Sequence, residues 1–222
     1  MNVTIPMLAQ LSLFASLDEQ DLAEIAPHVR IETFEPGHDI ALAGEPCDLM
    51  YIVVEGIIRV RRLSLEGREY VLEYVRPGQT FNLAAALDSG TNLASGEAMT
   101  QTTTYAIPCD RFRRFVRDHP SVAAVALAHL SSQVRHLSDT VEDLALHTVR
   151  ARLARFLLST GQEGAVPARH WTQEEIAAHI GTVRDVVGRT LRLFSQEGLI
   201  RRQRGRLVIT DRDGLEQVAQ YV

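Results

Sequence analysis

The feature that most restricts the fold is a long segment, 121–148, that contains neither glycine nor proline and carries apolar residues at helical spacing. These residues step alternately by four and three positions, which is the heptad pattern of a coiled coil. With two apolar positions per heptad, the stripe is narrower than that of most core-packed helices and favours a parallel homodimer. The alternative is a long helix that lies on its own domain. We predict a dimerisation helix at 119–147, whose contact residues are Leu127, Leu130, Val134, Leu137, Val141 and Leu144.

Before this helix, a helical lead-in (6–29) gives way to short apolar runs separated by recurring glycines. In the run REYVLEYV, apolar residues alternate with charged ones, as in a half-buried strand, and the preceding SLEGRE supplies a hairpin turn. Short strands from Ile31 to Pro108, with turns at roughly ten-residue spacing, predict an antiparallel jelly-roll β domain. We place this sensor domain, a β-roll with an N-terminal helix, at residues 1–118.

After the long helix come VRARLARFLLST, a polar loop GQEGAVPARH, and two helix starts close together. Thr172 and Glu175 have the spacing of a capping box, in which each side chain bonds the other residue's backbone N–H. Thr182 and Asp185 repeat that spacing, and Gly181 before them can adopt the positive φ of a sharp turn. Two helices that meet across such a turn predict a helix-turn-helix within a domain at 148–222.

The second of these helices has two distinct faces. On a helical wheel, one face gathers the packing residues Val183, Val187, Thr190, Leu191 and Phe194. The opposite face gathers Arg184, Asp185, Gly188, Arg189, Arg192 and Gln196. A basic hairpin follows, with Arg201, Arg202, Arg204 and Arg206, and then a closing helix. The alternative is a solvated face on a buried helix, but the combination of parts favours a winged helix-turn-helix whose second helix enters the major groove.

The outward residues suit double-stranded DNA. Arg184 or Arg189 can form a bidentate pair with guanine, whereas Arg192, Arg202 and Arg204 suit phosphates. Asp185 has two readings, as an acceptor from cytosine N4 or as a helix-capping residue paired with Arg189. The threonines of the two predicted caps, Thr172 and Thr182, complete the predicted DNA-binding set.

Charge and composition agree with this division. The net charge is −5, but residues 1–148 hold 11 Arg and 20 acidic residues, whereas residues 149–222 hold 12 Arg and 8 acidic residues. The basic character is therefore local to the predicted DNA-binding domain. No apolar run has the length of a membrane span, and the N-terminus lacks the pattern of a secretory leader, so we expect a cytoplasmic protein without a membrane partner. Two cysteines, Cys47 and Cys109, argue against a disulfide framework and against a zinc or cluster site.

The segment TQEEIAAHIGTVRDVVGRTLRLFSQEGLI resembles the DNA-binding signature of the CRP/FNR superfamily of bacterial transcription regulators. The glycine pattern in PGHDIALAGEPCDLMYIVVEGIIRV and YVRPGQTF is similar to that of the family's β-roll. The resemblance covers nearly the whole chain. It implies an α+β fold with an N-terminal β-roll, a long central dimerisation helix and a C-terminal winged helix-turn-helix. It also implies RNA polymerase as a partner, and base contacts from Arg184, Asp185 and Arg189.

The effector region departs from the cyclic-AMP-binding members. Where these have a Gly-Glu-Leu and an Arg-Ser-Ala segment, this chain has Asn82-Leu83-Ala84 and Asn92-Leu93-Ala94. The arginine that pairs with the cyclic phosphate is therefore missing, so cyclic AMP is not the expected ligand. The cysteine cluster of the oxygen-sensing members is missing as well. We predict an effector pocket lined by Phe81, Asn82, Leu83, Asn92, Leu93 and Ala94.

The effector itself and any cofactor stay open at this point. The region Thr80–Met99 is somewhat similar to haem-containing nitric oxide sensors of the family, which makes haem one alternative. Its axial ligand would come from His28, His38, His119, His129 or His136. A redox role of Cys47 is another possibility. A metal-binding jelly-roll enzyme would need clustered histidines, and His38 stands alone in the β region, so we expect no metal site and no enzymatic activity.

Overall fold

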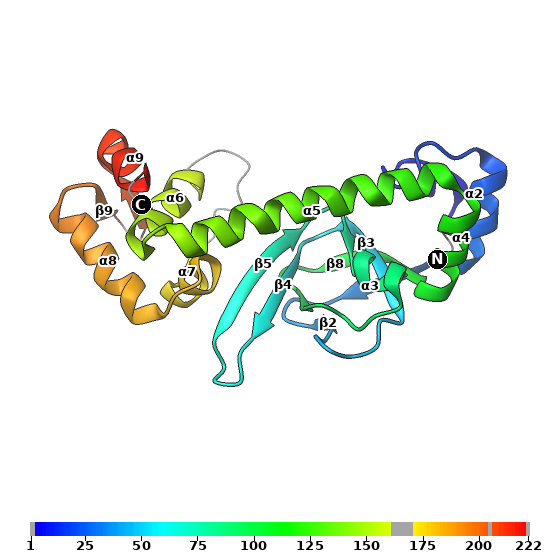
Figure 1. Ribbon diagram of the computed structural model, residues 1–222, viewed down its shortest axis with the longest axis horizontal. Helices are drawn as coiled ribbons and strands as arrows, with labels where there is room; N and C mark the ends of the chain where they lie inside the picture. Colours follow the sequence, from blue (N-terminus) through cyan, green and yellow to red (C-terminus); the bar gives the residue numbers. More distant parts are fainter. Residues whose placement is uncertain (1–2, 161–170, 204–205, 221–222) are drawn as a thin grey trace. The chain divides into compact units, whose positions relative to one another are not determined.

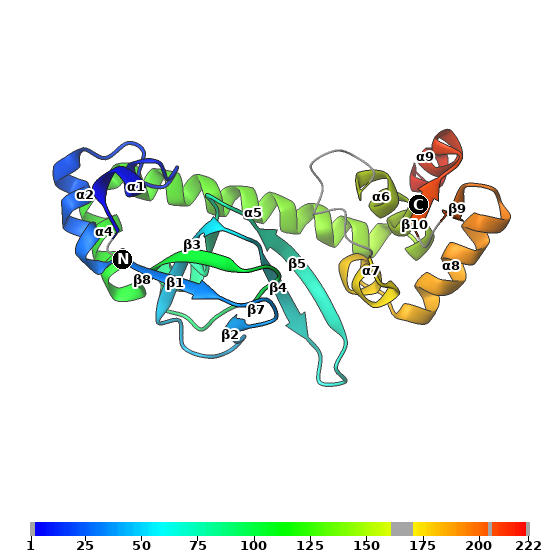
Figure 2. The same cartoon turned by 180° about the vertical axis from the view of Figure 1, so that it is seen from behind.

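Two four-stranded antiparallel sheets form the β-roll, with strand orders β1-β8-β3-β6 and β2-β7-β4-β5. The computed structural model describes residues 3–160, 171–203 and 206–220. Figure 2 shows the strands side by side. They are β1 (Arg30–Phe34), β2 (Asp39–Ala41), β3 (Leu49–Glu55), β4 (Ile58–Leu63), β5 (Glu69–Val75), β6 (Thr80–Phe81), β7 (Ser95–Ala98) and β8 (Thr102–Pro108). The predicted jelly-roll architecture is confirmed.

The chain divides into two units, each with its own core. The first comprises Met1–Arg62 and Val71–Arg135, and the second Leu63–Tyr70 and His136–Val222. The predicted hairpin turn joins β4 to β5, where the Ser64 N–H donates to the Arg68 carbonyl at 2.8 Å and Gly67 has a φ of 77°. Within the described residues, no helix combines the length and apolarity that a bilayer span requires.

Helices accompany the β-roll in the first unit (Figure 1). They are α1 (Ile5–Ala9), α2 (Glu19–Ile25), the short 3-10 helix η1 (Ala26–His28), α3 (Leu83–Asp88) and α4 (Cys109–Asp118). The lead-in helices agree with the prediction, whereas α3 and α4 were not predicted. Phe14, Phe112 and Phe115 fill a core between helices, and a second cluster around Tyr51, Val53 and Phe81 lies between the sheets.

Helix α5 (Pro120–Leu146) confirms the long helix. Of its predicted contact residues, Leu130 is half-buried against the helical core of the first unit. The others are exposed in the single chain, with Leu127 63%, Val134 65%, Leu137 46%, Val141 64% and Leu144 41% accessible. The alternative that this apolar stripe packs on the chain's own domain therefore fails for most of its length.

The second unit contains a helical core and a two-stranded wing, whose strands are labelled in Figure 2. Its elements after α5 are α6 (Val149–Thr160), α7 (Gln173–Ile180), α8 (Arg184–Gln196), β9 (Ile200–Gln203), β10 (Arg206–Ile209) and α9 (Arg212–Gln220). Phe156, Ile176, Val187, Phe194 and Leu215 are buried together. The predicted polar loop at 161–170 and the turn residue Arg204 lie outside the described residues.

Candidate nucleic-acid interface

The turn between α7 and α8 is built as the first predicted capping box and the glycine require. Thr172 Oγ1 accepts from the Glu175 N–H at 3.2 Å, and Glu175 Oε2 accepts from the Thr172 N–H at 2.9 Å. Gly181 ends α7 with a φ of 66°. A Cβ at this position would lie 2.6 Å from Leu144 Cδ2, so a larger residue would both adopt an unfavourable positive φ and have to displace the Leu144 side chain.

The second predicted capping box is wrong. The N-cap of α8 is Val183 and no side chain caps the helix, which begins at Arg184. The physical reason lies in the turn, because the Thr182 N–H donates to the Ala177 carbonyl at 2.9 Å and closes the end of α7. Thr182 thus belongs to the end of the first helix. Val183, predicted to pack, is 41% exposed.

Helix α8 presents its charged side chains to solvent and its apolar side chains to the core. Arg184, Asp185, Arg189 and Arg192 are exposed. On the opposite side Val187, Leu191 and Phe194 are buried. Arg150 of α6 fixes the far end of the helix, since its guanidinium lies 5.4 Å from the Phe194 ring centroid and forms two bonds of 2.9 and 2.6 Å with Glu197.

Gly188 was predicted to face outward with the arginines, and this is wrong. It is buried, and a Cβ there would meet Gln173 Oε1 of α7 at 3.0 Å. The side chain of Gln173 covers this position, so a larger residue at 188 would have to displace it. The outward face of α8 is therefore narrower than predicted.

Few contacts hold the charged face of α8. Arg184 Nη1 lies 3.1 Å from Glu174 Oε1, and both side chains are more than half exposed, so this pair is weak and can be exchanged for another anion. Within the described residues, no ion pair joins Asp185 to Arg189. Asp185 lies in the first turn of α8, where the helix dipole favours a carboxylate. Arg202 on β9 is exposed.

The predicted effector residues fall into separate environments. Phe81 and Ala94 are buried between the sheets. Asn82 Nδ2 donates to Asn92 Oδ1 at 2.9 Å, and Asn92 Nδ2 donates to the Leu42 carbonyl at 3.0 Å. Leu83 instead packs in the helical core, and Leu93 is 62% exposed. The structure therefore brings Phe81 and Ala94 together between the sheets and joins Asn82 to Asn92 by a hydrogen bond, whereas Leu83 and Leu93 lie in other surroundings.

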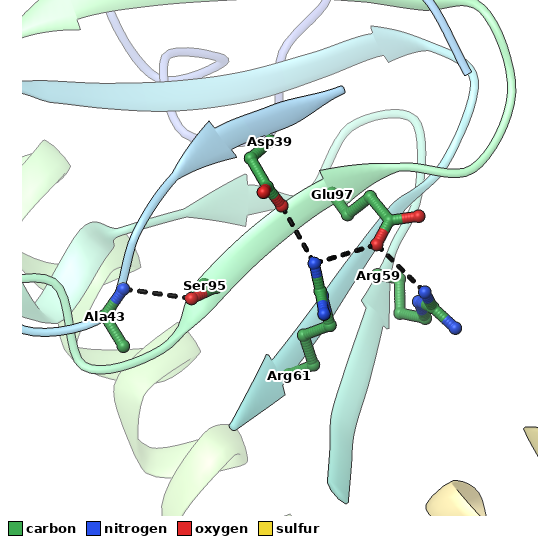
Figure 3. Close-up of polar contacts among 6 residues, drawn as sticks. All are labelled: Asp39, Ala43, Arg59, Arg61, Ser95 and Glu97. Atoms are coloured by element: carbon green, nitrogen blue, oxygen red, sulfur yellow. Dashed lines mark hydrogen bonds and ion pairs between the residues drawn. The ribbon is translucent and has the colours of Figure 1, made fainter. Parts of the chain in front are cut away.

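Two arginines of β4 take part in an ion-pair network that was not predicted from the sequence (Figure 3). Glu97 Oε2 lies 2.9 Å from Arg59 Nη2 and 3.1 Å from Arg61 Nη2, and Asp39 Oδ1 lies 3.0 Å from Arg61 Nη2. The two arginine side chains are only 15 and 16% exposed. The sequence does contain a pattern that could have indicated this network, because Arg59 and Arg61 alternate with apolar residues on one strand. Their acidic partners, however, follow only from the strand register, which places Arg59 opposite Glu97.

Comparisons with known proteins agree with this architecture. The profile of the cyclic nucleotide-binding domain matches residues 31–119, and that of the Crp-like helix-turn-helix domain matches residues 151–218. A solved structure of a CRP/FNR-family protein from Eubacterium rectale has a TM-score of 0.81 at 25% identity, covering 95% of this chain and 98% of that one. The chain belongs to the CRP/FNR family of transcription regulators.

Relatives within the family carry different regulatory names. A CRP-like cAMP-activated global transcriptional regulator of Mycobacterium tuberculosis is 28% identical over 221 residues, covering 96% of this chain and 99% of the relative. A global nitrogen regulator of Synechococcus elongatus is 25% identical over 198 residues, covering 85% of this chain and 89% of the relative. Membership of the CRP/FNR family therefore establishes a DNA-binding regulator and leaves the effector to be inferred from this chain's own residues.

Proposed function

We propose that this CRP/FNR-family protein is a homodimeric, sequence-specific and non-enzymatic regulator that binds a pseudo-palindromic operator in the cytoplasm. The observation that carries this proposal is the two-sided α8, with exposed Arg184, Asp185, Arg189 and Arg192 opposite a buried apolar side. A helix of this kind is anchored by its own domain while its charged side remains available to the major groove. RNA polymerase is the further partner that the family resemblance implies.

The exposed stripe on α5 supports the homodimer. Leu127, Val134, Leu137, Val141 and Leu144 are all exposed in the single chain although they repeat at heptad spacing. Two copies of the helix would remove these side chains from water, and the repeat matches the two-stranded geometry. A two-fold axis along α5 then gives two recognition helices, which calls for two operator half-sites about one helical turn apart.

The roles of the α8 residues follow from their positions. Arg184 and Asp185 occupy the first helical turn, and Arg189 follows about one turn later on the same exposed face. We assign base contacts to these three residues, with Asp185 as an acceptor from cytosine N4. Arg192 and Arg202 are assigned to phosphates, as is Arg204 from the sequence alone. Thr172, whose hydroxyl serves the cap of α7, and Thr182 complete the DNA-binding set that we propose.

Selection of duplexes from a random pool by the purified protein tests this function, and a palindromic consensus is expected. Arg189→Ala should then reduce the preference for the consensus over a mismatched duplex by about 5- to 150-fold, the loss of one bidentate base contact. Arg192→Ala should weaken binding to both duplexes equally and lower the salt slope by about one. The proposal would be contradicted if both variants changed the preference for the consensus over the mismatched duplex equally, or if no consensus were selected.

The effector is proposed to be a ligand other than cyclic AMP. Leu93, in the segment that replaces Arg-Ser-Ala, is exposed, and the nearby Arg59 and Arg61 already pair with Glu97 and Asp39. Arg62, the next arginine of β4, donates to the Leu93 carbonyl. A cyclic phosphate would therefore have to draw an arginine away from a carboxylate or from this carbonyl to obtain a cationic partner. Calorimetric titration with cyclic AMP should show no saturable heat at concentrations up to the millimolar range, and micromolar binding would overturn this part.

Haem remains the alternative effector-sensing group, and the histidine positions do not favour it. His119 has its Nδ1 2.9 Å from the Phe115 carbonyl oxygen and its Nε2 3.3 Å from Asp21 Oδ1, so both ring nitrogens have partners. His38 is exposed on the turn before β2. The inter-sheet cluster around Phe81 is formed by apolar side chains, and His38 meets its edge at Phe34, with ring centroids 6.4 Å apart. Protein purified from haem-supplemented cells should show no Soret band, and a band lost on replacing one histidine would establish the alternative.

A further inference from the structure

Two cysteines that the proposed function does not use lie in contact in the first unit. Cys47 precedes β3, and Cys109 is the first residue of α4. Their Sγ atoms are 3.2 Å apart although 62 positions separate them in sequence. Both are free thiols, and they are the only two cysteines in the chain. The fold therefore creates a dithiol that the spacing of the cysteines did not indicate.

The backbone around the pair keeps the two sulfurs together. In the β3–β8 ladder Leu49 pairs with Pro108, and just beyond this pair the Cys109 N–H donates to the Asp48 carbonyl at 2.9 Å. A disulfide has a sulfur–sulfur distance of about 2.05 Å, so bond formation requires the two sulfurs to approach by about 1.2 Å. Rotation of the half-buried Cys47 side chain can supply such a movement while the ladder stays intact.

The two thiols differ in access and in acidity. Cys47 is half-buried, whereas Cys109 is 2% exposed and packs in the helical core. The hydrogen bond from the Cys109 thiol lowers the pKa of the Cys47 thiol, and the Arg113 charge acts in the same direction against burial and Asp48. The same hydrogen bond, together with burial, raises the pKa of Cys109. Cys47 thus has the access and the thiolate character of an attacking cysteine, and Cys109 the position of a resolving one.

We propose that Cys47 and Cys109 form an oxidant-sensing site, at which a hydroperoxide converts the pair into an intramolecular disulfide. The Cys47 thiolate attacks the peroxide, the O–O bond breaks, and Cys47 becomes a sulfenic acid while the leaving oxygen takes up a proton as water or alcohol. The Cys109 sulfur then attacks the Cys47 sulfur, and the sulfenic oxygen leaves with the Cys109 proton as water. Two thiols thus give two electrons to one peroxide, and a dithiol reductant reverses the reaction.

The disulfide would link the entrance of β3 to the first turn of α4. Arg113 of α4 donates to the Ala86 carbonyl of α3, the helix that directly follows Asn82. The covalent link thus lies one hydrogen bond away from the segment in which we predict the effector residues. Because it closes a long loop, it should raise the thermal midpoint of unfolding by several degrees. This inference does not depend on the effector or on the DNA-binding assignment.

Hydrogen peroxide added to the reduced full-length protein tests the proposal. We expect the intact mass to fall by two hydrogens, both thiols to be lost to a thiol reagent under denaturing conditions, and dithiothreitol to restore them. Retention of both thiols, or covalent dimers on a non-reducing gel in place of the internal link, would overturn it. This readout on the unaltered chain needs no variant to fold.

Two variants separate the roles of the cysteines. Cys109→Ala should accumulate a Cys47 sulfenic acid that dimedone traps, because the resolving thiol is gone. Cys47→Ala should leave Cys109 reduced at the same peroxide dose, because that sulfur is buried. Thiol loss in Cys47→Ala at the rate of the unaltered protein would contradict the assignment. Cys109→Ser serves as a second variant, and circular dichroism checks that each one is folded.

Discussion

At the residue scale, the structure bears on the two interpretations of Asp185 and on the pKa of His179. Asp185 was read equally as a capping residue or as a base-contacting residue, and α8 begins at Arg184 with no side-chain cap. His179 on α7 lies against the rings of Phe156 and Trp171, with centroids 5.0 and 5.9 Å away. Burial in this aromatic setting, and secondarily the charge of His136, lowers the pKa of His179. The proton is therefore bound more tightly in the unfolded chain than in the folded one.

The His179 shift predicts a pH dependence of stability. Above the unfolded pKa of about 6.5 both states are neutral at this residue and its contribution to stability is complete. As the pH falls below that value the unfolded state takes up the proton first, so stability is lost until the folded pKa is passed. Urea unfolding between pH 7.5 and about 5 should show this loss, and His179→Gln should reduce the slope. An unchanged slope in the variant would assign the effect to other groups.

At the element scale, local rules identified α7 well and failed at the start of α8. The capping box of α7 uses only residues within one helical turn. Its two hydrogen bonds therefore follow from the three-residue spacing of Thr172 and Glu175 in the sequence. The same spacing at Thr182 and Asp185 gave a false prediction, because the end of the preceding helix had already engaged Thr182. A motif rule holds only where no neighbouring element competes for the same backbone groups.

Replacing the cap residue of α7 should measure its contribution. Thr172→Ala removes the acceptor for the Glu175 N–H and should lower the free energy of unfolding of the second unit by about 1 kcal/mol. Thr172→Ser keeps the hydroxyl and should stay near the original stability. Chemical denaturation followed by the fluorescence of Trp171, which packs beside Phe156, provides the measurement. If Thr172→Ser lowered the free energy of unfolding as much as Thr172→Ala, the loss of stability would not come from the capping hydrogen bond.

At the scale of the whole molecule, the single chain leaves an apolar stripe on α5 in contact with water. Val134 and Val141 are 65 and 64% exposed. Pairing of the α5 helices of two copies would remove these side chains from water. The homodimer stays a prediction. Val134 and Val141 can be replaced to test it without disturbing either core, because both side chains are exposed.

A charge on the stripe should separate the two copies. Val141→Glu places carboxylates on both helices at the predicted contact and should shift the protein from dimer to monomer at micromolar concentration in sedimentation velocity. Ser132→Glu, on the opposite side of α5 and also exposed, is the matched control and should remain a dimer. Secondary structure should be unchanged in both variants. A dimer that persists in Val141→Glu would move the interface elsewhere.

The sequence alone determined the features that depend on neighbours along the chain. Periodicity gave the long helix, turn residues gave the hairpins and the Gly181 turn, and the wheel of α8 placed the arginines opposite Phe194, because each pattern is complete within a few residues. Only the tertiary structure decided which distant residues meet. The Arg59–Glu97 pair, the burial of Gly188 against Gln173, the separation of Leu83 from Phe81 and the contact of Cys47 with Cys109 all depend on strand register and helix crossing. Those relations are set by packing of the whole core, which no local pattern contains.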